Sequence, residues 1–111
     1  MVRDGVGFFE AGDVDADRAR RASPYLEFLR VPSMSAGLYV LPAGDVDGQV
    51  PHKQDELYYI ARGKARMRAG TQDREVGRGT LIFVAADVEH RFYGIEEDLE
   101  VVVFFAPAET E

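Results

Sequence analysis

The sequence predicts a single all-β domain, folded as a sandwich or a barrel. Short apolar runs recur along the 111 residues, and glycine, proline and aspartate separate them. Several runs alternate apolar and polar side chains, as a strand with one buried face does. Only Val14–Ala22 has helical character, and it is short and poor in apolar residues. Many short strands with turn residues between them favour an all-β architecture.

The first expected strands lie in the amino-terminal half of the chain. Tyr25–Arg30 alternates apolar and polar residues, and Ala36–Leu41 is a second short apolar run. The segment Pro42–Asp45 stops this run, and Asp47 with Gly48 is a further turn signal. We therefore expect two early strands and then an irregular segment.

The second half carries the longer strand signals. Glu56–Ala61 is rich in large apolar residues and suits a strand with both faces covered, and Lys64–Ala69 alternates strictly. Turns at Gly70-Thr71 and Gly77–Gly79 then flank an expected strand over Gln72–Val76. The remaining expected strands are Leu81–Val84, His90–Tyr93 and Leu99–Phe105.

The length and composition fit one globular domain. The chain is 46% hydrophobic and 30% charged, and a domain of this size buries roughly two-thirds of the surface that its unfolded chain exposes. We expect residues 1–111 to form a single domain. Within it, residues 1–22 are expected to form an amino-terminal extension, and residues 107–111 are expected to form a flexible acidic tail.

Composition also argues against several classes of partner. The net charge of −7 would mostly repel a phosphate backbone, so we expect no nucleic-acid partner. No apolar run approaches the ~20 residues of a membrane-spanning helix, so we expect no membrane partner. The chain has no cysteine, and the amino terminus lacks the pattern of a signal peptide. These two features predict a cytoplasmic location.

Histidine is scarce, and its positions are informative. The chain has only His52, which lies just ahead of a strand that opens with Glu56, and His90, which begins another strand. A lone histidine is more often a surface residue or a satisfied core residue than a ligand. Imidazoles and a carboxylate brought together from neighbouring strands can nevertheless bind a metal.

The spacing around His52 resembles the first motif of the cupin family, G-x5-H-x-H-x3-E-x6-G. Alignment on Glu56 places Gly44, His52 and Gly63 at fixed positions of the motif. Every fixed position matches except the first histidine, where this chain has Val50.

The spacing around His90 resembles the second cupin motif, G-x5-P-x-G-x2-H-x3-N. Gly79 and His90 match, while the proline, glycine and asparagine positions hold Ala85, Asp87 and Gly94. The two motifs span about half of the chain. The sequence thus resembles a small single-domain bacterial cupin, which implies the conserved cupin β-barrel, also described as a double-stranded β-helix or jelly roll.

The resemblance also implies a divalent metal, which could be Fe, Mn, Ni or Zn. The family's ligand positions leave His52, Glu56 and His90 as the metal ligands in this chain. The position of Val50 supplies no donor, so an amide oxygen of Gln54 or Gln49 could take its place. Strand alternation, however, points Gln49 away from the side of His52.

Two histidines and one carboxylate still form a usable ligand set. With a water molecule they complete a zinc site, and with open positions they match the triad of non-haem Fe(II) oxygenases. The alternative is that the site has decayed and the barrel binds a ligand without metal.

Strand periodicity predicts which side chains surround the site. If Glu56 faces the interior, Tyr58 and Ile60 face inward, and Leu57 and Tyr59 face outward. His90 would likewise take Phe92 inward. The other candidate pocket residues are Tyr39, Val50, Met67, Phe83 and Phe104. By position alone, Tyr58 and Glu89 are candidate catalytic residues.

Several functions remain open at this point. The first is a metalloenzyme acting on a small organic substrate, with a dioxygenase preferred on the ligand set; isomerases, epimerases and lyases use similar cupin sites. The alternative is a non-catalytic module that binds a sugar or an aromatic metabolite. An accessory domain acting through protein contacts is the weakest candidate. We also expect a homodimer, formed through the outward Leu57 and Tyr59 with a contribution from Tyr25–Arg30.

Overall fold

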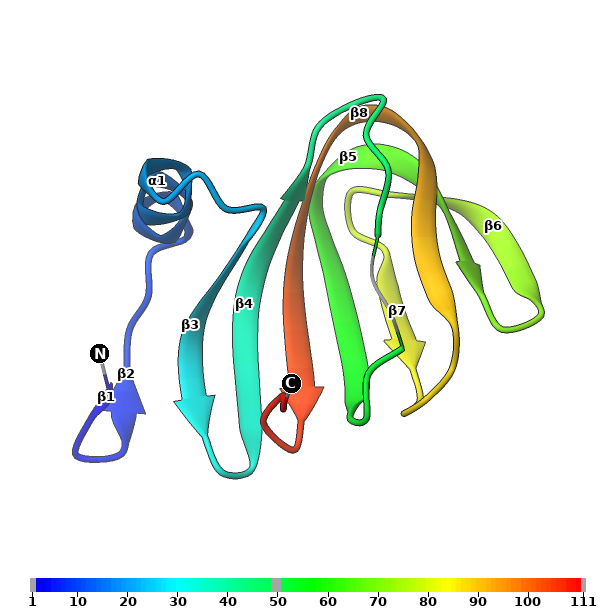
Figure 1. Ribbon diagram of the computed structural model, residues 1–111. Coiled ribbons are helices and arrows are strands. Elements are labelled where there is room, and N and C mark those ends of the chain that lie inside the picture. The colour runs from blue at the N-terminus through cyan, green and yellow to red at the C-terminus, as the bar shows by residue number, and fades with distance from the viewer. Residues whose placement is uncertain (1, 49–50, 111) are drawn as a thin grey trace.

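The computed structural model describes residues 2–48 and 51–110. Among them are one helix and eight strands, and nearly all of the regular structure is β (Figure 1). The elements are β1 (Val2–Arg3), β2 (Val6–Gly7), α1 (Ala11–Arg20), β3 (Tyr25–Val31), β4 (Met34–Leu41), β5 (Asp55–Ala69), β6 (Gln72–Gly77), β7 (Leu81–Val84) and β8 (His90–Ala106). The predicted all-β fold class is confirmed.

Two long strands organise the main sheet. The strand order is β3-β4-β8-β5-β6, and β7 pairs with β5 beside this path. Strand β5 pairs with β7 through its first half and with β6 through its second half, while β8 runs antiparallel to it along most of its length. Both long strands arch over the top of the molecule in Figure 1, so that the sheet rolls around an interior.

The structure joins strands that the sequence predicts as separate. Glu56–Ala61 and Lys64–Ala69 are parts of β5, and the two last predicted strands are both parts of β8. The pairing of β5 with β8 shifts register between Ile60 and Arg66. Gly63 lies in this stretch with a φ of 102°, and a Cβ there would collide with the backbone oxygen of Asp98. Strand β5 therefore bends at β-bulges and stays continuous, so no turn divides it into two strands.

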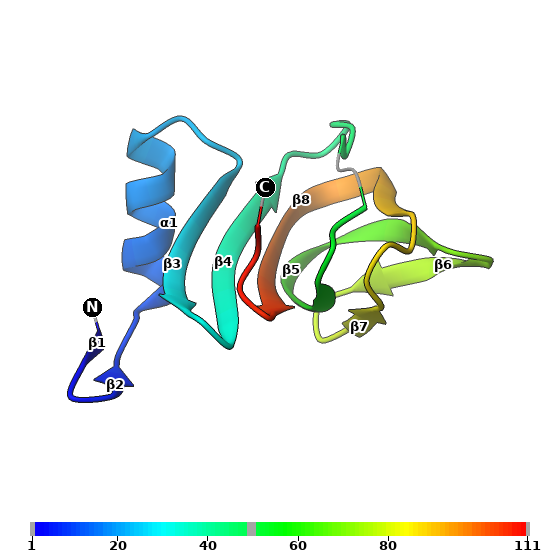
Figure 2. The ribbon, with the colours of Figure 1, turned by 60° about the horizontal axis from the view of Figure 1, so that its bottom comes forward.

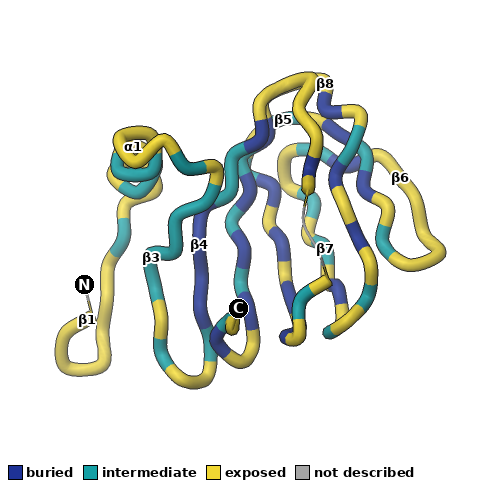
Figure 3. The backbone as a smooth tube through the Cα atoms, in the orientation of Figure 1, coloured by how far each residue is buried: buried dark blue, intermediate teal, exposed yellow. Residues whose placement is uncertain are grey.

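Burial along β5 follows the predicted alternation in its first half. Tyr58 and Ile60 are fully buried, whereas Leu57 and Tyr59 are exposed. The inward and outward facing predicted for these four residues is thus confirmed, and the expectation that both faces of this strand are covered is wrong. Figure 3 shows the buried positions alternating along the central strands.

The interior of the rolled sheet forms one apolar core. From β5 and β8 it takes aromatic and branched side chains, including Tyr58, Ile60, Phe92, Val101 and Phe105. Phe92 is fully buried, which confirms its predicted inward facing. The site described below lies at one end of this core.

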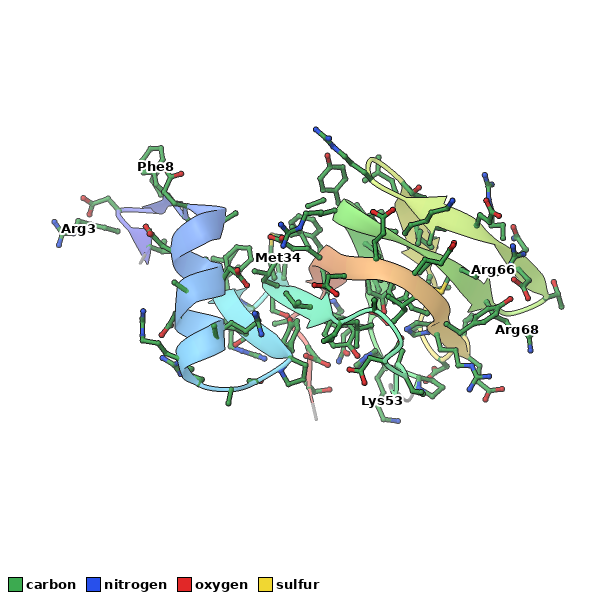
Figure 4. The ribbon with its side chains drawn as sticks, turned by 90° about the horizontal axis from the view of Figure 1, so that it is seen from above. Arg3, Phe8, Met34, Lys53, Arg66 and Arg68 are labelled. Carbon is green, nitrogen blue, oxygen red and sulfur yellow. The ribbon has the colours of Figure 1, made fainter. Side chains whose placement is uncertain are left out.

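The amino-terminal residues lie outside the barrel. Helix α1 begins three residues before the predicted Val14 and packs against β3, beside the main sheet (Figure 2). The β1-β2 hairpin extends farther out, and Figure 4 shows Arg3 and Phe8 pointing away from the rest of the molecule. No helix among the described residues is long and apolar enough to cross a membrane.

The residues after β8 turn back against the sheet. The backbone nitrogen of Ala108 donates to the oxygen of Pro32 at 3.5 Å, and that of Glu109 donates to Ser35 Oγ at 2.9 Å. These contacts place Pro107–Thr110 over the ends of β3 and β4. Flexibility of the 107–111 tail stays a prediction, and residue 111 lies outside the described residues.

Four apolar side chains share the outer face of β5 and β7. Leu57 pairs in register with Phe83, and Tyr59 with Leu81. Their exposed fractions are 39%, 65%, 40% and 63% in that order. Contiguous exposed apolar surface on a small domain commonly marks a contact with another protein.

We expect this outer face to pair two copies of the chain. Wild-type protein should sediment as a dimer at micromolar concentration, and the double variant Leu57→Arg/Phe83→Arg should sediment as a monomer, because charge on both strands opposes burial of the face. Val46→Arg, at an exposed apolar residue away from these strands, serves as the control and should stay dimeric. A monomeric wild type would refute the expectation.

Candidate metal centre

The rolled sheet brings His52, Glu56 and His90 together. Glu56 points inward from β5, His90 begins β8, and His52 lies just before β5. One ligand atom from each of the three residues lies within 4.8 Å of the other two. A backbone hydrogen bond of 2.7 Å from Asp87 to the oxygen of His52 ties together the two segments that carry the histidines.

Asp87 also explains a departure from the second cupin motif. It stands where the motif has glycine, and its φ is 67°, in the left-handed region. Aspartate is among the residues that enter this region more readily than most. The turn before His90 can therefore keep its shape without the glycine.

Both histidines direct Nε2 toward the same oxygen of Glu56. His90 Nε2 lies 3.1 Å from Glu56 Oε1, and His52 Nε2 lies 3.9 Å from it. On the other side of each ring, Nδ1 has an acceptor: Val88 O at 2.8 Å for His90, and Glu109 Oε2 at 2.9 Å for His52. Acceptors at Nδ1 favour the tautomer whose Nε2 lone pair can bind a metal.

The second oxygen of Glu56 is a buried acceptor that a cation could satisfy. The residue is 2% exposed, and its Oε2 has no hydrogen-bond partner among the described residues. A buried carboxylate without full compensation is costly. Two imidazole nitrogens and a carboxylate suit Zn²⁺, Fe²⁺, Mn²⁺ or Ni²⁺, so the residues present fit a divalent metal.

The pKa of His90 also indicates that the site favours positive charge. Burial by itself lowers the pKa of His90, but the hydrogen bonds to Glu56 and to the Val88 carbonyl outweigh it and raise the pKa above its ordinary value. The site thus favours positive charge next to Glu56. A divalent metal would take the place of the proton in supplying that charge.

Of the two candidate catalytic residues, only Tyr58 is brought to the centre. Its hydroxyl lies 2.9 Å from His90 Nε2, and its ring packs edge-on against Phe92 with centroids 5.3 Å apart. Glu89 is exposed and lines a surface hollow with Arg68 and Arg91, and His90 also borders this hollow. The alternation of β8 that turns His90 inward turns its neighbour outward.

A cavity of about 200 Å³ lies beside His52. Its lining comes from β3, β4 and β8, from the segment before β5 and from the segment after β8. It consists of Tyr25, Tyr39, His52, Val103, Phe105 and Glu109. Of these, Tyr39 and His52 were singled out from the sequence. Phe105 was missed, because it lies opposite Glu56 only in the register of β5 and β8, which the sequence alone does not give.

Two tyrosines of this cavity are held in different ways. Tyr39 donates to Asp47 Oδ1 at 2.8 Å, whereas the buried hydroxyl of Tyr25 has no hydrogen-bond partner among the described residues. The ring of Tyr25 lies across Gly37, where a Cβ would collide with it. Burial and nearby acids raise the pKa of both phenols above the ordinary value, with Glu109 acting on Tyr25 and Asp47 on Tyr39.

Three predicted pocket residues do not line the cavity beside His52, although Met67 and Phe83 both border a different hollow along β5, β6 and β7. Phe83 is exposed on the outer face opposite Leu57. Phe104 also pairs with Leu57 and faces outward, because the inward positions in this part of β8 are the odd-numbered ones. Met67 is buried, but it belongs to the core opposite Phe92 and does not line the cavity beside His52.

The residues proposed for the vacant ligand position are only partly described. Val50 and Gln49 lie outside the described residues. Gln54 is buried and donates from Nε2 to Thr110 Oγ1 at 2.8 Å, while its Oε1 has no hydrogen-bond partner among the described residues. A role for Gln54 as an extra ligand stays a prediction.

Comparison with known proteins supports the fold and the family. Residues 37–106 match the family model described as a cupin domain. An uncharacterized protein of Streptomyces coelicolor is 44% identical over 102 residues, which cover 92% of this chain and 97% of the relative.

The solved structures that resemble this chain share the rolled sheet. An RmlC-like cupin with a double-stranded β-helix fold from Methanocaldococcus jannaschii is 19% identical, with a TM-score of 0.68 over 75% of this chain and 78% of the other. KdgF from Halomonas sp. is also 19% identical, with a TM-score of 0.68 over 75% and 76%. The DMSP lyase DddQ from Ruegeria pomeroyi is 23% identical, with a TM-score of 0.64 over 68% of this chain but only 39% of the lyase.

The structure also predicts a stabilising role for Asp47. Besides Tyr39, its carboxylate accepts from the buried backbone nitrogen of Phe92 at 3.0 Å. Asp47→Ala should lower the free energy of unfolding by about 1–3 kcal/mol, because a buried donor loses its acceptor. Asp45→Ala, at an exposed position two residues away, should change it by less than about 0.5 kcal/mol. Denaturant unfolding measures both, and equal effects would contradict this role.

Proposed function

The chain belongs to the cupin domain family, and from that premise we propose that it is a small metal-dependent cupin enzyme. In this proposal His52, Glu56 and His90 hold a divalent metal, and a small organic substrate binds beside it. The observation that carries the proposal is the convergence of both Nε2 atoms on Glu56 Oε1, while Glu56 Oε2 is buried without a partner.

The ligand set favours a dioxygenase. Three protein ligands leave coordination positions open, and a redox-active metal bound there would supply Lewis-acid and O₂ chemistry. The protein's part is to orient both imidazoles through Nδ1 and to exclude water from Glu56. Tyr58 lies against His90 and can hold or deliver a proton at its hydroxyl.

The cavity indicates which substrates suit the site. Val103 and Phe105 provide apolar surface, and Tyr25 offers a buried hydroxyl that can donate or accept. Burial, and after it the nearby acids, raises the pKa of Tyr25, so negative charge is disfavoured at its hydroxyl. We therefore favour a small, uncharged organic substrate over a carboxylate or a phosphate.

A lyase is the second candidate reaction. The DMSP lyase DddQ shares the fold of this chain, and one fold hosts several chemistries, so isomerases and epimerases remain alternatives as well. A non-catalytic module that binds a sugar or an aromatic metabolite would use the same cavity. Consumption of O₂ with some small substrate would favour the dioxygenase, and its absence with metal bound would favour the alternatives.

A cytoplasmic location is also a proposal, supported by the absence of cysteine from the sequence.

Removing the metal tests the proposal most directly. Metal that binds only the folded chain should stabilise it by about 2.7 kcal/mol at a hundred times its dissociation constant. A chelator should therefore lower the melting temperature, and Fe²⁺, Mn²⁺, Ni²⁺ or Zn²⁺ should restore it. Elemental analysis of protein purified without a histidine tag identifies the native metal. No metal by that analysis, with a melt unchanged by chelator and by added ions, would rule the metal site out.

Substitution of the ligands should separate metal binding from folding. His52→Ala and His90→Ala should each abolish metal binding and leave a folded barrel, because neither histidine belongs to the apolar cluster that forms the core. Calorimetric titration with Zn²⁺ measures binding, and far-ultraviolet circular dichroism measures folding. Glu89→Ala is the matched control, next to His90 but outward, and should bind metal as the wild type does. Retained affinity in either histidine variant would remove that histidine from the ligand set.

A further inference from the structure

We propose that Glu109 is the positioning residue for His52. Its carboxylate holds Nδ1 of the imidazole, which fixes the ring with Nε2 toward Glu56. The contact between His52 Nδ1 and Glu109 Oε2 is seen directly, and its consequence for metal affinity rests on the proposed function.

Each histidine has a hydrogen-bond acceptor at Nδ1, but the two acceptors are of different kinds. His90 Nδ1 is held by the backbone oxygen of Val88 in the same short segment, at 2.8 Å. For His52 the acceptor is Glu109 Oε2, at 2.9 Å, from a residue 57 positions later in the sequence. A carboxylate at this place selects one tautomer and raises the basicity of the nitrogen that faces the metal.

The segment after β8 is anchored on both sides of the Glu109 side chain. The backbone nitrogen of Glu109 donates to Ser35 Oγ at 2.9 Å, and its backbone oxygen accepts from Arg30 at 2.7 Å. One residue earlier, Ala108 donates to Pro32 O, and one residue later, Thr110 accepts from Gln54 at 2.8 Å. The carboxylate is therefore delivered by a backbone fixed to β3, to β4 and to the segment that carries His52.

The neighbouring Arg30 does not compete with His52 for the side-chain carboxylate of Glu109. Arg30 directs its guanidinium to the Glu27 carboxylate, with contacts of 2.8 and 3.0 Å, and touches only the backbone oxygen of Glu109. The side chains of His52 and Glu109 are 17% and 24% exposed, so solvent screens the pair less than it screens a surface ion pair.

His52 needs such a partner more than His90 does. His90 is the first residue of β8, and the strand's hydrogen bonds hold its backbone. His52 lies in an irregular segment before β5, so its ring orientation depends on side-chain contacts. Loss of an outer-shell partner typically lowers metal affinity roughly 10- to 100-fold.

The test compares Glu109→Ala and Glu109→Gln with wild type, and Glu97→Gln, at an exposed acid of β8, is the control. Nitrogen-15 NMR reads the tautomer of both histidines, which are the only two in the sequence. Metal-free protein is measured at a pH well above the ordinary imidazole pKa of ~6.5. Titration with Zn²⁺ gives the affinity.

We expect wild-type His52 to carry its proton on Nδ1. Glu109→Ala should lose that preference and bind Zn²⁺ roughly 10- to 100-fold more weakly, while the tautomer of His90 stays unchanged. Glu109→Gln keeps an acceptor oxygen, so it should recover the tautomer preference and part of the affinity. Glu97→Gln should match the wild type in both measurements.

Two results would overturn the assignment. An unchanged His52 tautomer in Glu109→Ala would show that the carboxylate does not hold the ring. Equal disturbance of both histidines would show that Glu109 acts on the fold as a whole. Failure of wild-type protein to bind Zn²⁺ would instead sink the proposed metal function, and the tautomers of the metal-free protein would still decide whether Glu109 positions His52.

Discussion

The buried carboxylate of Glu56 is the constraint around which the site is arranged. It points into a rolled sheet whose interior is otherwise apolar, and burial of an acid there requires positive charge or hydrogen-bond donors. Two imidazoles converge on one of its oxygens, and the other oxygen is unsatisfied. The turn that holds His90 and the segment that holds His52 are both positioned to serve this group.

The two-residue periodicity of the strands correctly predicted which side chains face the site, but only where the strands are regular. Facing deduced from Glu56 holds for Tyr58 and Ile60, and facing deduced from His90 holds for Phe92. Farther along each long strand the inward positions change from even to odd numbers, because bulges insert residues without breaking the ladder. Phe104 was proposed as pocket lining, whereas its neighbour Phe105 lines the cavity, and no local pattern in the sequence reveals that shift.

The residues that sequence analysis missed reach the site through long-range contacts. Glu109 belongs to a segment read as a tail, and Asp47 was read as part of a turn. Each acts through hydrogen bonds to residues far along the chain, such as Ser35 for Glu109 and Phe92 for Asp47. Spacing motifs capture ligands close to one another in sequence, whereas these supporting contacts exist only once the sheet has rolled.

The backbone segments that carry the residues of the centre are stabilised in two different ways. Glu56 and His90 belong to paired strands, so moving either disrupts the sheet, whereas His52 and Glu109 belong to irregular segments held by a few hydrogen bonds. Segments of the second kind open locally at lower free energy than central strands. A metal could therefore enter and leave by transient release of the irregular segments while the barrel stays folded. The exchange rate would then follow the opening of these segments rather than global unfolding.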